Sequence, residues 1–327
     1  MIRTMRNWLL PESIDDVLPA EAAALEALRR TLLDHFADRG YRLVRPPLIE
    51  HLESLLTGSG RDLDLLTFKV VDPMSGRLVG VRADITPQIA RIDAHLLNEP
   101  GATRLCYAGS VLRAVAEGPG ATREIMQVGA ELFGVPGIDG DREVVALLVS
   151  SLTKAGVRGL HLDLGHMGVY RALERAAGIG GNGDDTALFD ALRTKDQPGV
   201  RALTKQLPAA WRNALEALPT LYGPAAEVLR AARAQLPDIP SIANALASLD
   251  ALATAAAPLV EALHIDLADL RGYHYHNGAI FSVFTAGEPN AIANGGRYDG
   301  IGKAFGRARP ATGFTLYLRQ LADMLSR

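Results

Sequence analysis

The stretch that decides the fold is "REIMQVGAELF", residues 123–133. Apolar and polar side chains alternate along it. The apolar positions are Met126, Val128, Ala130 and Leu132. The intervening positions carry Arg123, Gln127, Gly129 and Glu131. This period of two predicts a β-strand with one face in the core. Because Gly129 has no side chain, we expect a gap beside Gln127 and Glu131 that admits a small ligand.

Other elements extend outward from this strand. Strand-like runs are "YRLVRPPLIE", "LLTFKVVD", "LVGVRADIT", "TRLCYAGSVLR" and, further on, "GLHLDLG". Apolar residues at helical spacing predict helices from Pro19 to Gly40, from Pro87 to about Leu97, and from about Asp141 to Ala155. From about Val169 to Leu263 the composition shifts to Ala and Leu, which predicts several helices and no strand.

Strand character returns in "RGYHYHNGAIFSVF", residues 271–284. Its Asn277-Gly278 pair predicts a tight type I′ hairpin, with His274 and His276 facing one way and Tyr273 and Tyr275 the other. The expected architecture is α+β, a mostly antiparallel sheet interrupted by a helical insertion. We therefore predict a discontinuous core of residues 1–168 and 264–327, and an insertion of residues 169–263.

Composition indicates a globular protein without obvious nucleic-acid affinity. Of 327 residues, 48% are hydrophobic and 22% charged, and the net charge is −3. Cys106 is the single cysteine, so neither a disulfide framework nor a thiolate metal site is expected. We see no apolar run that approaches the ~18–20 residues of a membrane span and no signal-peptide core. These features predict a cytoplasmic protein without a cofactor or a metal.

Polar residues gather on one face of several predicted strands. Arg82, Asp84 and Thr86 share a face of "VRADIT", and Arg113 shares a face with Gly109. For any one strand, a solvated outer face is the alternative. Together, however, the acids Asp84 and Glu131 with Gln127 suit an ammonium group, while Arg113 and Arg271 suit a carboxylate. This combination predicts a pocket for an amino acid.

The motifs resemble the catalytic core of histidyl-tRNA synthetase, a class II synthetase fold with an antiparallel sheet. They are, in order, "YRLVRPPLIE", "VRADITPQ", "YAGSVLRAVAEGPGATREIMQVGAELFG", "RGYHYHNGAIF" and "GGRYDGIGKAFG". The stretches "LESLLTGSGRDLDLLTFKVVD" and "RADITPQIARIDAHLLN" are more similar to a paralogous family, the regulatory subunit of short-form ATP phosphoribosyltransferase. The resemblance implies a subunit that does not aminoacylate, but supports a small catalytic subunit and carries feedback inhibition by histidine.

The resemblance also assigns histidine-binding residues. Asp84 matches a contact to the substrate amino group, and Thr86, Gln127 and Glu131 match its other amino-end contacts. Arg113 matches the motif 2 arginine, and Arg271 matches the arginine of the histidine-specific "RGLDYY" segment. Tyr275 matches the first tyrosine of that segment, and His276 replaces the second. Tyr298 matches the tyrosine that contacts the imidazole. The site for free histidine is therefore expected to be largely present.

Departures from the synthetase pattern point away from catalysis. Gln320 stands where motif 3 has its ATP-binding arginine, and Arg319 precedes it. Since one residue turns a helix by about 100°, Arg319 cannot replace that arginine while Phe314, Leu318, Leu321 and Leu325 face the core. The motif 2 "ERP" reads "VAE" at residues 115–117. The anticodon-binding domain of the synthetase is missing from the pattern, so no tRNA partner is expected.

Several alternatives stay open at this point. The chain could be a histidyl-tRNA synthetase-like, amino-acid-activating enzyme without its anticodon domain, or a histidine-binding regulator of another partner. His274 and His276 could bind a metal, although no third ligand lies nearby in the sequence. We read Arg307 and Arg309 as solvated loop charges and not as phosphate ligands. The region around Pro47 resembles the family's dimer interface, which predicts a homodimer within a hetero-oligomer and no membrane contact.

Overall fold

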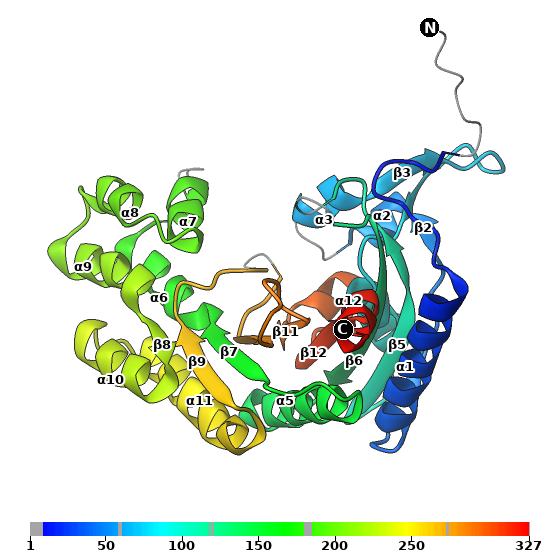
Figure 1. Cartoon of the computed structure of the whole chain (residues 1–327). Coiled ribbons are helices and arrows are strands. Elements are labelled where there is room, and N and C mark those ends of the chain that lie inside the picture. Colours follow the sequence, from blue (N-terminus) through cyan, green and yellow to red (C-terminus); the bar gives the residue numbers. More distant parts are fainter. Residues whose placement is uncertain are drawn as a thin grey trace, which may run out of the picture.

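The computed structural model describes residues 9–57, 61–116, 118, 121–179, 185–272 and 275–326. Its main feature is a nine-stranded sheet with the order β1-β5-β6-β12-β11-β10-β7-β9-β8 (Figure 1). Neighbouring strands are antiparallel, apart from the parallel pairs β1–β5 and β7–β9. The strands are β1 (Arg42–Leu43), β5 (Thr103–Leu112), β6 (Glu124–Phe133), β7 (His161–His166), β8 (Tyr222–Pro224), β9 (Ala262–Asp266), β10 (Ala279–Phe284), β11 (Ala293–Arg297) and β12 (Ala311–Tyr317). The predicted α+β class is confirmed.

One face of the sheet packs on helices. Helices α1 (Pro19–Ala37), α5 (Gly137–Lys154) and α12 (Leu318–Leu325) contact β6. The alternation in β6 works as predicted, because Val128, Ala130 and Leu132 are buried in this core. In α1, which begins with a proline at its first position, the buried residues recur at helical spacing: Leu25, Leu28, Leu32 and Phe36. These contacts fix the opposite face of β6 as the polar one.

A smaller sheet lies beside the polar face, in the order β2-β4-β3. Its strands are β2 (Ile49–His51), β3 (Phe68–Val71) and β4 (Leu78–Val81), with the short helices α2 (Leu52–Leu55) and α3 (Arg61–Leu66) between them in the chain. Helix α4 (Thr86–Arg91) follows and continues as the π-helix η1 (Ile92–Leu97), as the sequence predicted for this segment. Ile85 and Ile89 pack against Leu105 and Tyr107 of β5, which anchors α4 over the large sheet.

The prediction of one continuous strand through "VRADIT" was wrong. Strand β4 ends at Val81, and helix α4 begins at Thr86. Arg82 donates hydrogen bonds to the carbonyl oxygens of Pro46 (2.9 Å) and Ser110 (2.8 Å). The chain turns here because Pro87 suits the first turn of a helix and gives no hydrogen to a strand ladder. Asp84 and Thr86 therefore reach the site from a bend and a helix N-terminus.

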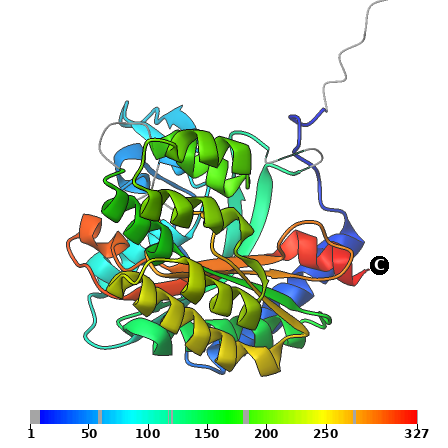
Figure 2. The ribbon, with the colours of Figure 1, turned by 90° about the vertical axis from the view of Figure 1, so that its left-hand side faces the viewer.

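The segment after β7 is mainly helical, as predicted. It contains α6 (Met167–Ala177), α7 (Asp185–Arg193), α8 (Gln197–Thr204), α9 (Ala209–Ala217), α10 (Ala225–Gln235) and α11 (Pro240–Ala256), with the short 3₁₀ helices η2 (Leu218–Thr220) and η3 (Ala257–Leu259). Figure 2 shows these helices in front of the sheet. The prediction that it has no strand was wrong, since β8 lies inside it and β9 begins at Ala262. Both extend the large sheet, and the domain boundaries stay a prediction.

Helix α11 corrects our statement about apolar runs. The segment Pro240–Leu259 is long and apolar enough to cross a membrane by length and composition. The only charged residue in it is Asp250, which pairs with Arg233. In the fold, α11 packs against α5, α6, α10 and β7 and buries seven residues: Ile242, Ala245, Leu246, Leu249, Leu252, Ala253 and Ala256. Its apolar character is that of a core helix.

The predicted hairpin at Asn277-Gly278 was also wrong. Neither residue has the positive φ that a type I′ turn requires. Strand β10 begins only at Ala279 and pairs with β7 and β11. The amide nitrogens of Tyr275 and His276 donate to the Gly272 carbonyl, so this segment turns before it enters the sheet. Tyr273 and His274 lie outside the described residues.

Candidate functional site

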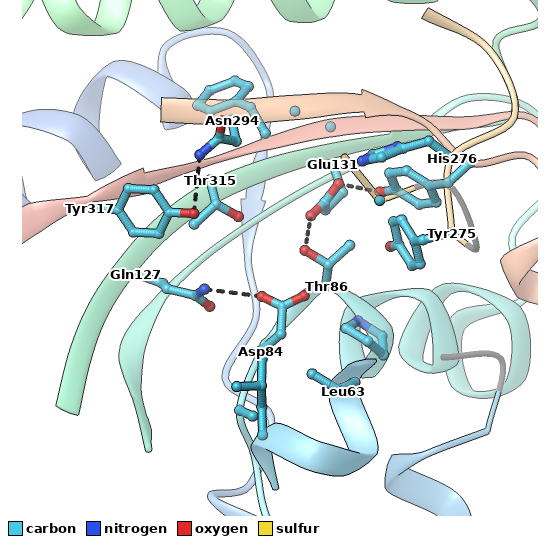
Figure 3. A pocket seen from close by; sticks show the side chains of 18 of the residues that line it. Leu63, Asp84, Thr86, Gln127, Glu131, Tyr275, His276, Asn294, Thr315 and Tyr317 are labelled. Carbon is cyan, nitrogen blue, oxygen red and sulfur yellow. Dashed lines mark hydrogen bonds between the residues drawn. The ribbon is translucent and has the colours of Figure 1, made fainter. Parts of the chain in front are cut away.

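A cavity of about 280 Å³ opens on the polar face of the large sheet. Its walls come from β6, β11, β12, the bend before α4 and the turn before β10 (Figure 3). Eight of the nine predicted residues line it: Asp84, Thr86, Arg113, Gln127, Glu131, Tyr275, His276 and Tyr298. The strand, the helix start and the turn thus bring together residues that are far apart in the sequence.

At one end of the cavity, Asp84 pairs with Gln127. The Gln127 amide nitrogen donates to Asp84 Oδ1 at 3.0 Å, and the Ile85 backbone nitrogen donates to Gln127 Oε1 at 3.2 Å. Burial raises the pKa of Asp84, whereas the hydrogen bond from Gln127 and the charge of Arg113 lower it. The amide nitrogen and the amide oxygen of Gln127 both form hydrogen bonds, which hold this side chain in place. This end of the cavity therefore presents a fixed carboxylate, that of Asp84, to a cationic ligand group.

Glu131 forms a second acidic centre and is 1% exposed. The Thr86 hydroxyl donates to Glu131 Oε1 at 2.9 Å, and the Tyr298 hydroxyl donates to Oε2. Burial raises the pKa of Glu131 to about 8, although these hydrogen bonds lower it. A carboxyl group with this pKa is mostly neutral at neutral pH. A ligand that donates hydrogen bonds would favour its ionised form.

Aromatic side chains form the wall next to Glu131. The Tyr275 and Tyr298 ring centroids are 4.9 Å apart, and those of Tyr275 and His276 are 5.1 Å apart. Burial lowers the pKa of His276 to about 4, so its ring stays neutral. His276 Nδ1 lies 3.3 Å from the Arg297 carbonyl oxygen, which fits a protonated Nδ1 that donates. This wall suits a flat, polar ring such as an imidazole.

Two glycines shape the cavity differently from the sequence prediction. The expected gap above Gly129 is not open, because a Cβ there would collide with the ring of Tyr107. That ring is buried, and its hydroxyl lies 2.7 Å from Thr315 Oγ1 and 3.3 Å from Thr86 Oγ1. At Gly313 a Cβ would collide with the carboxylate of Glu131. Glycine at position 313 therefore makes room for the acid, and Tyr107 supports the cavity floor.

Arg271 is the one predicted residue that the structure places elsewhere. It lines a neighbouring cavity of about 590 Å³, which shares Arg113, Asn294 and Tyr317 with the first. Its guanidinium donates to both carboxylate oxygens of Asp269, at 2.8 and 2.6 Å, and this pair holds the side chain outside the first cavity. Sequence reasoning missed Asn294, Thr315 and Tyr317, which alternate on the polar faces of β11 and β12 and could have been found by the period of two.

A family model described as histidyl-tRNA synthetase matches residues 13–321. The ATP phosphoribosyltransferase regulatory subunit of Ralstonia nicotianae is 57% identical over 320 residues, which cover 98% of this chain and 82% of that protein. The protein with the same name from Thiobacillus denitrificans is 55% identical over 317 residues, which cover 97% of this chain and 98% of that protein. This chain belongs to the ATP phosphoribosyltransferase regulatory subunit family. The family predicted from the motifs is thereby confirmed.

A solved structure supports the same fold assignment for this member of the regulatory subunit family. It is described as an ATP phosphoribosyltransferase regulatory subunit/histidyl-tRNA synthetase from Bacillus halodurans. Its TM-score is 0.86 at 27% identity, and the alignment covers 98% of this chain and 83% of that one. The predicted class II synthetase-like architecture is confirmed.

In this regulatory subunit family member, Arg319 and Gln320, at the place of the synthetase motif 3 arginine, line the neighbouring cavity of about 590 Å³. Gln320 donates a hydrogen bond to the Asn290 carbonyl (3.4 Å), and Arg319 forms an ion pair with Glu21 (2.8 Å). Leu318 and Leu321 face the core as expected, whereas Leu325 is 42% exposed. Arg319 is therefore already paired with a carboxylate of α1.

Two arginines near the cavity are structural in this fold. Arg297 of "GGRYDG" is buried and pairs with buried Asp141 of α5 at 2.9 Å. Our reading of Arg309 as a solvated charge was wrong: its side chain is 8% exposed and pairs with buried Asp93 at 3.3 Å. Two glycines of this segment, Gly295 and Gly296, lie in β11. There they give room to the rings of Phe281 and His276.

Proposed function

We propose that this chain is a non-catalytic regulatory subunit of a short-form ATP phosphoribosyltransferase and binds free L-histidine for feedback control. The observation that supports this most directly is that two acidic centres and an aromatic wall lie in the same cavity. The neighbouring cavity, by contrast, has Gln320 where the resemblance places the ATP-binding arginine of the synthetase. Activity would reside in the catalytic subunit, which is the proposed partner in the cytoplasm.

The geometry suggests how histidine would lie. Asp84, held by Gln127, would accept the ammonium group, and Arg113 would pair with the carboxylate. The resemblance assigns Glu131 to the amino end, but its contact with Tyr298 places it at the aromatic wall. We therefore propose that Glu131 and Tyr298 together bind the imidazole. Arg271 would act from the neighbouring cavity.

Feedback control requires a coupling between this cavity and the catalytic partner. A coupling of about 1–3 kcal/mol changes affinity roughly 5- to 150-fold. The coupling is reciprocal for binding. If a transferase substrate weakens the binding of histidine, histidine weakens the binding of that substrate by the same factor. Histidine would favour one arrangement of the complex through its different contacts in each.

Calorimetry with L-histidine and with ATP tests this proposal. We expect saturable histidine binding and no measurable ATP binding by the isolated chain. Robust histidine-dependent ATP–pyrophosphate exchange would instead support the alternative, a histidyl-tRNA synthetase-like activating enzyme. Co-purification with a small phosphoribosyltransferase whose activity rises when this chain is added would separate the proposal from a regulator of some other partner. No tRNA dependence is expected.

Histidine affinity should depend on pH through Glu131. Burial raises the pKa of Glu131 to about 8, and hydrogen bonds from the ligand would stabilise the carboxylate. Binding below about pH 8 would then release a proton. The dissociation constant should therefore fall as pH rises toward 8, by up to about tenfold per pH unit. Calorimetry in buffers of different ionisation enthalpy measures the released proton, and the Glu131→Gln variant should lose both effects. A flat pH profile in the unmodified chain would contradict this role.

The proposed homodimer has a candidate surface near Pro47. Large apolar side chains are exposed on and beside the small sheet: Leu43, Leu48, Ile49, Val70, Val71 and Leu78. Ile49 and Val70 share one face of this sheet, and Val71 and Leu78 share the other. Exposed apolar side chains in this number are typical of an interaction site. We expect Ile49→Asp to weaken dimerisation by roughly 100-fold or more, because it places a charge in an apolar interface. Sedimentation velocity over a range of concentrations measures this effect. Leu203→Asp on α8, which is similarly exposed (47% against 53%), is the control and should leave the dimer intact.

A further inference from the structure

A second group of polar side chains lies where the helical insertion leaves and rejoins the sheet. His161 and Asp163 are on β7, and His264 is on β9. One ligand atom from each of the three residues lies within 4.8 Å of the others. Asp163 pairs in register with His264, and residues two apart on a strand share a face, so all three side chains point to one side. Sequence spacing cannot reveal this group, because His264 follows the entire insertion.

Two ligand atoms of this group face each other. His161 Nε2 and Asp163 Oδ1 are buried atoms, and among the described residues neither forms a hydrogen bond. They lie 3.2 Å apart and form an ion pair when His161 is protonated. Two ligands of one tetrahedral zinc ion are separated by about 3.4 Å when each lies about 2.1 Å from the metal. The first two ligands are thus already at a suitable separation, and a side-chain rotation would bring in the third.

The surroundings allow a metal to enter. His161 and Asp163 line an open cavity of about 500 Å³, which Glu261 and Glu288 also line. Arg271 acts electrostatically on Asp163, but its guanidinium is hydrogen-bonded to Asp269. Imidazole nitrogens with one carboxylate are the ligand set of zinc and related divalent transition metals. Water or Glu261 would complete the coordination.

We infer that His161, Asp163 and His264 form a binding site for a divalent transition metal, with zinc as the preferred ion. The metal would link β7, which precedes the insertion, to β9, which follows it, and so hold the base of helices α6–α11. The metal site and the proposed histidine cavity lie on the same face of the large sheet. A cross-strand row of paired residues connects them: His264, Asp163, Ser282, Asn294 and Thr315. The inference departs from the sequence prediction of no metal, and it does not depend on histidine binding.

Zinc titration of the full chain tests the inference. The protein is freed of any affinity tag and stripped with a chelator, and L-histidine is left out because its imidazole would compete for zinc. We expect one zinc ion per chain by calorimetry, and the visible absorption of a four-coordinate site with Co²⁺. Zinc should also raise the melting temperature of the unmodified chain. His264→Ala and Asp163→Asn should each weaken binding by at least about 100-fold, since loss of even an outer-shell partner costs 10–100-fold.

The control variant is His95→Ala, which removes an exposed histidine of η1 outside this group. It should bind zinc like the unmodified chain. Circular dichroism of the metal-free variants checks their folding, and the isosteric Asp163→Asn carries the test if His264→Ala does not fold. The inference is overturned if the unmodified chain shows no saturable binding at one zinc per chain. Unchanged affinity in the folded His264→Ala or Asp163→Asn variant would equally overturn it.

Discussion

Replacement of Glu131 by Gln should weaken L-histidine binding by roughly 30- to 5,000-fold, about 2–5 kcal/mol. The carboxyl group is 1% exposed and connects Thr86 and Tyr298 across the cavity. Gln keeps the shape but cannot supply the charge that we propose pairs with the ligand. It also presents an amide N–H toward one of the two hydroxyl donors. Glu131→Ala should abolish binding, because it removes the acceptor and leaves the buried hydroxyl of Tyr298 without it.

The fold of the Glu131→Gln variant should survive. Burial raises the pKa of Glu131 from its ordinary value of 4.5 to about 8. The unfolded chain therefore loses this proton at a lower pH than the folded chain does. It follows that Glu131 lowers the free energy of unfolding as pH rises from about 4.5 to 8. A neutral Gln lacks this penalty, so the variant should be at least as stable as the unmodified chain in this respect at pH 8.

A matched control for this prediction is Glu143→Gln. Glu143 is a partly buried carboxylate of α5 that pairs with Arg104 at 2.7 Å and lines neither the cavity that contains Glu131 nor its neighbour. Its replacement should leave histidine affinity unchanged. Isothermal titration calorimetry with L-histidine compares the three proteins. If Glu131→Gln binds histidine as tightly as the unmodified chain, the proposed role of the cavity is wrong.

Strand periodicity explains why much of the site could be predicted. In β6, the alternation alone separated Val128 and Leu132, which belong to the hydrophobic core, from Gln127 and Glu131, which line the cavity. The same argument would have found Asn294, Thr315 and Tyr317, had it been applied to β11 and β12. Strand faces are readable because the sheet buries one side in a continuous core.

Segments outside regular strands could not be read in this way. The Asn277-Gly278 pair suggested a hairpin, yet hydrogen bonds from Tyr275 and His276 to the Gly272 carbonyl form a turn. Tyr275 and His276 line the first cavity, whereas Arg271, paired with Asp269, lines its neighbour. Similarly, the burial of Arg309 depends on Asp93, a partner far away in the sequence. Local sequence does not encode these distant contacts, which decide where each side chain points.

Replacement of Arg297 by Met should destabilise the protein by about 3–5 kcal/mol. Arg297 and Asp141 have side chains that are 7% and 5% exposed, and they lie 2.9 Å apart. Arg297 also donates to the Gly137 carbonyl oxygen at 2.6 Å, which ties β11 to the start of α5. Burial raises the pKa of Asp141, and the charge of Arg297 lowers it. Without the arginine, the Asp141 carboxylate stays buried and loses its compensating charge.

Urea denaturation with linear extrapolation measures this change, with Arg233→Met as the matched control. Arg233 pairs with Asp250 at 2.6 Å, but the two side chains are 51% and 48% exposed. Because water screens an exposed pair, its loss should cost no more than about 1 kcal/mol. The double variant Arg297→Met/Asp141→Leu should recover part of the loss, since it removes the unpaired buried charge. Asp299, the other partner of Arg297, is 39% exposed and can turn to water. If Arg297→Met and Arg233→Met lowered the free energy of unfolding equally, burial of the Arg297–Asp141 pair would not determine the loss of stability.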